Sequence, residues 1–241
     1  LARQQLSTLP HYRPAHLPNN SYYTLLVFDF LLDLIFPRFC VGCGKMGRYF
    51  CPECKKSIRF YSENISSKYH CPENLDGIFV LAHYDGIIRK AIREVKYRGK
   101  YTIFSEIAKM IPASPLGGNF DFLVPVPLSK QRMQRRGFNQ AEKLARYLLP
   151  NLPAGRQVLN CLIRTRNTKP QFDLKLHERE ENVKNAFTIN SNFIRQLGGS
   201  NLPVCLVDDV ATTGSTLNEC AKVLKKAGAS KVYAIVIARG N

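Results

Sequence analysis

Two adjacent acids and the small polar residues after them are the part of this chain best suited to chemistry. Asp208 and Asp209 come directly after the apolar run Val-Cys-Leu-Val. The loop after them can aim hydroxyls and backbone amides at one point, because the first N–H groups of a helix have no intrahelical partner and lie at the positive end of its dipole. The loop consists of Ala211, Thr212, Thr213, Gly214, Ser215 and Thr216. Such a segment predicts a binding site for a phosphate monoester.

The two carboxylates would repel a phosphate unless they bind something else. Vicinal sugar hydroxyls, or a Mg²⁺ ion that joins carboxylate and ligand, would account for both acids. The motif therefore predicts a sugar-phosphate site, in which Gly214 keeps the phosphate position clear of a Cβ. An acidic cap on an ordinary helix is the alternative. A nucleotide-binding P-loop is excluded, because no Gly-Lys-Ser/Thr follows the glycine.

Four of the eight cysteines lie in one fifteen-residue window as two CxxC pairs separated by seven residues. These are Cys40, Cys43, Cys51 and Cys54. Four thiolates complete a tetrahedral site with no open position, so the pattern predicts a structural metal, with zinc favoured and iron left open. Disulfides are the alternative, which a reducing compartment disfavours. The other four cysteines are scattered, and we expect them to be reduced.

A basic segment follows the expected strand at 121–128, and its cations are Lys130, Arg132, Arg135 and Arg136. They could neutralise a pyrophosphate, contact a nucleic-acid backbone, or simply form a solvated loop. The formal net charge of +17 favours polyanionic partners of some kind. The expected helix at 87–97 adds Arg89, Lys90, Arg93 and Lys96. Tyr84, Tyr97, Tyr101 and Phe138 could stack on the bases of single-stranded nucleic acid, although each is individually better explained as a core residue.

The elements that must position these residues alternate along the chain. We expect strands at 78–84, 121–128, 204–208 and 231–239, and helices at 87–97, 103–111, 138–150 and 215–228. This alternation predicts an α/β domain with a mainly parallel sheet flanked by helices. The segments at 152–158 and 191–203 resemble loops. Residues 164–187 resemble either a hood over a site or a surface hairpin.

The chain divides into four expected regions. Residues 1–20 are expected to be disordered, 21–60 to hold an amphipathic helix and the cysteine module, 61–76 to be a linker, and 77–241 to be the α/β domain. Asp29 and Asp33 interrupt the apolar run at 22–36, which is also too short to span a bilayer, so we expect a docking helix. Because residue 1 is Leu rather than Met, we expect the natural start to lie elsewhere.

The diacid loop resembles the ribose-phosphate signature of type I phosphoribosyltransferases. Together with the CxxC pairs, "YDGIIRKAIREVKYRG" and "RRGFNQA", it makes the chain similar to the ComF family of late-competence proteins from about residue 31 to residue 239. Ala211, at a position often occupied by a larger residue, and an expanded segment at 151–160 depart from the family pattern. The resemblance implies a zinc-ribbon-like module followed by a type I phosphoribosyltransferase-like domain.

The same resemblance implies a cytoplasmic factor that assists uptake of single-stranded DNA in natural transformation. Its ligand would be 5-phosphoribosyl pyrophosphate with Mg²⁺. Asp208 and Asp209 would hold the ribose at the catalytic position, the 212–216 loop would hold the 5′-phosphate, and a cation from 130–136 would meet the leaving group. Partners would include other competence proteins such as a DNA-uptake helicase, with peripheral contact to the inner face of the membrane left open. A salvage phosphoribosyltransferase with an unknown acceptor, and an assembly adaptor without turnover, are the alternatives.

Overall fold

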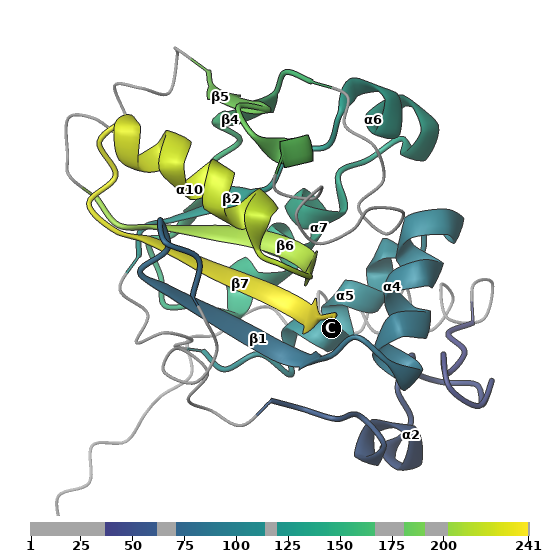
Figure 1. Ribbon diagram of the computed structural model, residues 1–241. Helices are drawn as coiled ribbons and strands as arrows, with labels where there is room; N and C mark the ends of the chain where they lie inside the picture. Colours follow the sequence, from purple (N-terminus) through teal and green to yellow (C-terminus); the bar gives the residue numbers. More distant parts are fainter. Residues whose placement is uncertain (1–36, 62–70, 114–119, 167–180, 191–201, 241) are drawn as a thin grey trace, which may run out of the picture.

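The architecture is a parallel β-sheet with helices on both faces (Figure 1). The computed structural model of the protein describes residues 37–61, 71–113, 120–166, 181–190 and 202–240. Five strands form the sheet in the order β1-β7-β6-β2-β3, and every neighbouring pair is parallel. The strands are β1 Gly77–His83, β2 Phe122–Pro125, β3 Gln157–Val158, β6 Val204–Ala211 and β7 Val232–Arg239. The predicted α/β class with a mainly parallel sheet is confirmed.

Each face of the sheet has its own apolar core. One face is covered by α4 (Gly86–Arg98), α5 (Phe104–Ala108) and α7 (Gln140–Leu148). The other face carries α10 (Ser215–Lys226) and an antiparallel hairpin of β4 (Leu162–Arg164) and β5 (Phe187–Ile189). Because strand side chains alternate between faces, Cys205 and Val207 of β6 enter the first core, while Val204 and Leu206 enter the second.

The helices form where the apolar spacing predicts them. In α4 the residues Ile88, Ala91, Ile92 and Val95 are buried, which is the one-sided spacing of an amphipathic helix. Gly99 ends that helix in the left-handed conformation, with φ of 69°, which a glycine adopts without steric cost. The expected helices at 138–150 and 215–228 also form, as α7 and α10, with boundaries that differ by a few residues.

Four local differences from the sequence expectation bear on the site. Strand β6 continues past Asp208 to Ala211, so both acids lie within the strand. The segment at 152–158, expected as a loop, contributes edge strand β3. The basic segment is a helix, α6 (Lys130–Arg136), because the Ser129 hydroxyl accepts a hydrogen bond from the Arg132 amide and caps its first turn. The expected helix at 103–111 splits into a 3₁₀ turn, η1 (Tyr101–Ile103), and α5.

The cysteine segment packs directly on the α/β domain. It contains the short helix α2 (Pro52–Lys56), and its Phe50 and Ile58 belong to the same core as α4. Residues 59–61 continue as an extended segment beside β1, with the Tyr61 amide donating to the Leu81 carbonyl at 3.0 Å and the His83 amide donating to the Arg59 carbonyl at 3.0 Å. The cysteine segment and the sheet are thus joined by both apolar packing and backbone hydrogen bonds.

Several expectations lie outside the described residues: the disorder of 1–20, the amphipathic helix at 22–36, most of the linker and most of the 164–187 segment. The described residues at the two ends of that last segment belong to the antiparallel pair of β4 and β5. The 3₁₀ turn η3 (Leu149–Asn151) follows α7. Within the described ranges, none of the helices has the length and apolar character needed to cross a bilayer.

Candidate functional site

The two acids of the motif lie on β6, between β7 and β2, and they face opposite sides of the sheet. Asp209 follows Val207 on the face covered by α4 and α7, and it is 3% exposed. Asp208 follows Leu206 on the face covered by α10 and the β4–β5 hairpin, and it is only partly buried. The Asp209 amide donates a 2.8 Å hydrogen bond to Asp208 Oδ1. The two carboxylates are therefore adjacent in the chain but stand in different surroundings.

Asp209 is held by a lysine from the neighbouring helix. Lys96 Nζ of α4 lies 2.7 Å from Asp209 Oδ2, and the two side chains are 21% and 4% exposed. Burial alone would lower the pKa of Lys96, but Asp209 and, more weakly, Asp208 raise it above its usual value. A carboxylate this deeply buried would be strongly unfavourable without such a partner. Lys96 and Asp209 thus form a buried ion pair that joins α4 to the central strand.

The environment of Asp208 disfavours its charged form. Burial, reinforced by the negative charge of Asp209, raises the pKa of Asp208 to about 8, while Lys96 opposes the shift. An acid with this pKa carries a proton much of the time at neutral pH. Near Asp208 lies a second cation, Arg164 of β4, whose guanidinium carbon is 5.2 Å from the centre of the Phe187 ring. Arg164 is only 7% exposed.

The helix N-terminus predicted to hold a phosphate lies immediately after β6. Gly214 caps α10 in the left-handed conformation, with φ of 82°. The Ser215 amide donates to Thr213 Oγ1 at 3.2 Å, and the two hydroxyls also share a hydrogen bond. A Cβ built on Gly214 would lie 2.6 Å from Pro72 Cγ, so both the backbone conformation and this contact require glycine. The space beside Gly214 thus holds the Pro72 ring.

Arg136, one of the four predicted cations of the basic segment, is the last residue of α6. It is partly buried and donates a hydrogen bond to Gln140 Oε1. Burial lowers the pKa of Arg136, and the charge of Asp209 opposes that shift. Lys130 and Arg135 are exposed, and Arg132 is partly buried. The helical form of this segment explains the division, because residues on a helix point in different directions.

The aromatic residues expected to stack on bases divide into two groups. Tyr97 is 60% exposed, with the Arg93 guanidinium carbon 5.7 Å from its ring centre. Tyr101 and Phe138 instead pack edge to face on the core, with ring centres 5.4 Å apart. Lys143 Nζ lies 4.6 Å from the Tyr101 ring centre. Around the C-terminal end of α4, aromatic and cationic side chains are therefore interleaved at the surface.

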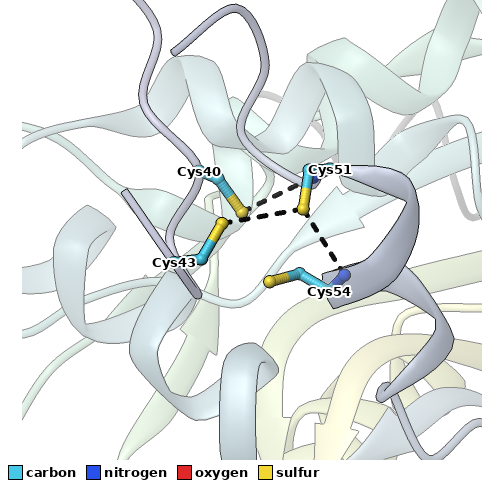
Figure 2. A group of neighbouring side chains, drawn as sticks. All are labelled: Cys40, Cys43, Cys51 and Cys54. Carbon is cyan, nitrogen blue, oxygen red and sulfur yellow. Dashed lines mark hydrogen bonds between the residues drawn. The ribbon is translucent and has the colours of Figure 1, made fainter. Parts of the chain in front are cut away.

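The four predicted metal ligands converge. The Sγ atoms of Cys40, Cys43, Cys51 and Cys54 all lie within 4.8 Å of one another (Figure 2). None of these cysteines forms a disulfide in the described structure, so the disulfide alternative is not what the geometry shows. The Cys51 amide donates to Cys40 Sγ and the Cys54 amide to Cys51 Sγ, both at 3.5 Å.

The chemistry of this cysteine cluster suits a metal ion. Burial would raise the pKa of Cys40, but hydrogen bonds from the backbone of Cys51, Cys43 and Gly42 together lower it to about 6. The same turn leaves no room at Gly42, where an added Cβ would lie 2.6 Å from Cys54 Sγ. Four clustered thiols with amide donors directed at sulfur fit a tetrahedral ion such as zinc.

The cysteine module is anchored by one carboxylate of the α/β domain. Glu106 of α5 accepts hydrogen bonds from the Tyr49 amide at 2.8 Å and the Phe50 amide at 3.0 Å, one on each carboxylate oxygen. The Tyr49 hydroxyl also shares a 2.6 Å hydrogen bond with Thr102 Oγ1. These contacts fix the residues that directly precede Cys51, and so connect the metal cluster to η1 and α5.

Comparison with known proteins finds similarity to bacterial proteins named for competence and for DNA utilization. It is 29% identical to Competence protein F of Haemophilus influenzae over 217 residues, which cover 83% of this chain and 90% of that protein. It is 27% identical to DNA utilization protein YhgH of Escherichia coli K12 over 213 residues, covering 83% and 88%. A third match, to Competence protein ComFC of Bacillus subtilis, is 28% identical over 165 residues, covering 65% and 61%. These similarities support assignment of the chain to the ComF family.

No protein-family model matches the chain, so the ComF assignment depends on these similarities to individual proteins. They extend over most of the chain, as the sequence resemblance did.

Two cations near the diacid, Lys96 and Arg164, were not predicted from the sequence to be part of its site. Lys96 was grouped with the basic face of its helix, and no sequence signal connects it to an acid 113 residues later. Arg164 did carry a usable signal, because it stands two residues after buried Leu162 in a strand and so faces the same way. Among the predicted residues, Asp208 and Asp209 both lie on β6, and the loop at 212–216 follows soon after them in the chain.

Proposed function

We propose that this ComF protein is a DNA-uptake or DNA-utilization factor whose α/β domain, residues 77–241, binds Mg²⁺-5-phosphoribosyl pyrophosphate. The single observation that carries the ligand is the diacid on the central strand, directly before a helix N-terminus and next to buried cations. The role in DNA handling is supported by the names of the relatives, which are competence and DNA-utilization proteins.

Each part of the ligand has a chemical counterpart in the site. The N-terminus of α10, with Thr213 and Ser215 beside it, suits the 5′-phosphate because its amides and dipole favour an anion. The acids suit the hydroxyls of the ribose. Arg136 lies on the side of Asp209 and suits the pyrophosphate. When bound, Mg²⁺ would neutralise part of the pyrophosphate charge, and the chain's own residues would position the sugar and exclude water.

The proposed DNA surface is the interleaved region at the end of α4. Exposed Tyr97, with Arg93 over its ring, and Lys143 beside Tyr101 combine stacking surface with positive charge. Aromatic stacking holds single strands without sequence preference, at about 1–3 kcal/mol per base. Each phosphate neutralised by this surface should contribute about −0.7 to the slope of log K against log salt.

Titration calorimetry tests the ligand proposal. Wild-type protein with Mg²⁺ and 5-phosphoribosyl pyrophosphate should give saturable binding, and the Asp208→Asn/Asp209→Asn variant should lose it while keeping the wild-type circular dichroism spectrum. If the double variant still binds the ligand, the diacid does not contribute to ligand binding. Binding of a fluorescent single-stranded oligonucleotide, measured at several salt concentrations with Tyr97→Ala as a test variant, examines the DNA surface independently.

Turnover is a second candidate function, supported by the environment of Asp208. A diacid with one member paired to Lys96, and with the charges of Arg164 and Arg136 acting on it, is the kind of preorganised charge arrangement found where charge develops during a reaction. A transferase would release pyrophosphate from the bound ligand when an acceptor base or amine is supplied. Coupled detection of pyrophosphate, with a panel of nucleobases and ammonia as acceptors, distinguishes a transferase from a binding protein.

A further inference from the structure

We propose that residues 71–74 form an autoinhibitory cover over the N-terminus of α10, and that a phosphate monoester binds there only when this cover moves away. The cover belongs to the short segment that leads into β1, and residues 75 and 76 are its fixed base. This inference rests on the proposed binding of a sugar phosphate, and it concerns how access to that same site is regulated.

The loop predicted to receive the phosphate is closed in this structure. Gly214 and Ser215 are both buried, although an anion can reach a helix N-terminus only where the first amides are accessible. The Ser215 amide donates to Thr213 Oγ1 at 3.2 Å, so one of the first donors of the helix already has a partner. A phosphate at this position requires the loop to be uncovered and this hydrogen bond to be exchanged for one to the ligand.

Pro72 lies in the space that the glycine leaves open. A Cβ built on Gly214 would lie 2.6 Å from Pro72 Cγ, and the next nearest atoms, at 3.7 and 3.8 Å, belong to the same ring. Glu73, the next residue of the cover, is exposed. A proline ring and an acidic side chain offer a phosphate neither a donor nor a positive charge. This turn is therefore better explained as a cover than as part of the phosphate site.

Two hydrogen bonds hold the cover on the first turn of α10. The Asn74 amide and Asn74 Nδ2 both donate to Asn218 Oδ1, at 2.9 and 3.1 Å. The Asn218 amide in turn donates to the Gly214 carbonyl, so this contact lies one helical turn from the glycine. Both bonds to Asn218 Oδ1 join neutral groups, and each contributes little enough for a bound ligand to offset.

The base of the cover is fixed more firmly. The Asp76 amide donates to the Val232 carbonyl and the Val232 amide donates to Asp76 Oδ2, both at 2.8 Å. Lys225 Nζ of α10 lies 3.0 Å from the same carboxylate oxygen. Leu75 is 7% exposed and belongs to the apolar core that α10 shares with the sheet. Residues 71–74 can therefore move away while residues 75 and 76 remain on the domain.

A covered site has a lower apparent affinity, because only the uncovered fraction of the protein can bind. Weakening the cover should therefore tighten binding, whereas a variant that merely damages the site would weaken it. Asn218→Ala removes both hydrogen bonds, Asn74→Ala removes the side-chain bond alone, and Pro72→Ala removes Cγ and Cδ of the ring beside Gly214. Asn160→Ala, at an exposed asparagine, is the control.

Calorimetry with ribose 5-phosphate and with Mg²⁺-5-phosphoribosyl pyrophosphate measures the effect, since both ligands carry the 5′-phosphate. Asn218→Ala should bind each ligand about 5- to 30-fold more tightly than wild type, the range that one to two neutral hydrogen bonds would give. Asn74→Ala and Pro72→Ala should show smaller gains in the same direction. The affinity of Asn160→Ala should differ from that of wild type by less than about 2-fold.

Hydrogen exchange of the wild-type protein is a second measurement of the same movement. Adding ligand should speed exchange of the Asn74 amide, because this amide loses its acceptor on Asn218 when the cover moves. Most amides near a bound ligand instead exchange more slowly, so faster exchange at this position is specific to an opening cover. This measurement needs no variant and stays decisive if a variant fails to fold.

Unchanged or weaker binding by Asn218→Ala and Pro72→Ala overturns the proposal, because residues 71–74 would then have no effect on the site or would form part of it. Unchanged or slower exchange of the Asn74 amide in the ligand-bound protein overturns it as well. If wild type binds neither ligand but Asn218→Ala does, the cover closes the site fully and the proposal holds. If neither protein binds either ligand, the proposed sugar-phosphate function itself fails, and this inference fails with it.

Discussion

Replacing Asp208 with Asn should make the protein more stable, and the gain should grow with pH. The folded protein raises the pKa of Asp208 to about 8, through burial first and the charge of Asp209 second. In the unfolded chain the same carboxyl has a pKa of about 3.9. Between these values the folded state holds a proton that the unfolded state releases. The free energy of unfolding therefore falls as pH rises from about 4 through about 8.

The size of the stability loss follows from the pH interval between the unfolded-state and folded-state pKa values of Asp208. Each unit of pKa difference corresponds to about 1.36 kcal/mol, so three pH units between pH 5 and pH 8 set an upper limit of about 4 kcal/mol. Because Asp208 is only partly buried and Lys96 and Arg164 lie nearby, we expect about half of that limit. Asn has nearly the same shape and no charge, so the variant removes this dependence and little else.

The assay is urea denaturation of wild type and Asp208→Asn at pH 5, 6, 7 and 8, without ligand. The stability advantage of Asp208→Asn should be about 2 kcal/mol larger at pH 8 than at pH 5. Exposed Asp121, replaced with Asn, is the control for a general effect of removing a carboxylate. A difference that is the same at pH 5 and pH 8 would show that Asp208 is an ordinary ionised acid, and would refute the electrostatic picture of the site.

Three other perturbations test separate parts of the structure. Lys96→Met should destabilise the fold by about 3–5 kcal/mol in thermal or urea unfolding, because it leaves the buried carboxylate of Asp209 without its cation. Adding Asp209→Asn to this variant should recover most of the lost stability. A small effect of Lys96→Met would mean that the ion pair is solvated. Cys40→Ser should lose stoichiometric zinc by elemental analysis together with stability, since metal binding contributes to folding free energy; a full metal content in that variant would reject the four-cysteine site. Glu106→Gln should cost about 1–3 kcal/mol and speed proteolysis around residues 37–58, because it weakens two hydrogen bonds to backbone amides; unchanged proteolysis would show that apolar packing alone docks the module.

The sequence was informative wherever local periodicity and local chemistry agree. The apolar spacing of α4 and α10 and the uniform apolar run of β7 lead directly to the observed elements. The two CxxC pairs likewise bring their four sulfurs together, because the turns between them are short and local. In these segments, residues close in sequence determine the result.

The parts that could not be predicted depend on distant contacts. Strand β3 has two residues, too few for a periodic signal, and exists because β2 offers it a parallel edge. The pairing of Lys96 with Asp209 joins α4 to β6, and only the folded sheet brings them together. The division of the two acids between faces follows from β6 continuing to Ala211, which the pairing with β7 extends beyond the apolar run.

The position of β7 in the sheet also makes the fold dependent on its last described strand. In the order β1-β7-β6, strand β1 has β7 as its parallel neighbour, so among the five strands of the described sheet residues 77–83 pair only with residues 232–239. A chain cleaved before residue 232 would leave both β1 and β6 with open hydrogen-bonding edges, and the edge of β6 carries the diacid. Open edges of this kind promote association between chains. Damage near the carboxyl end of this protein would therefore produce aggregation rather than a shortened but working domain.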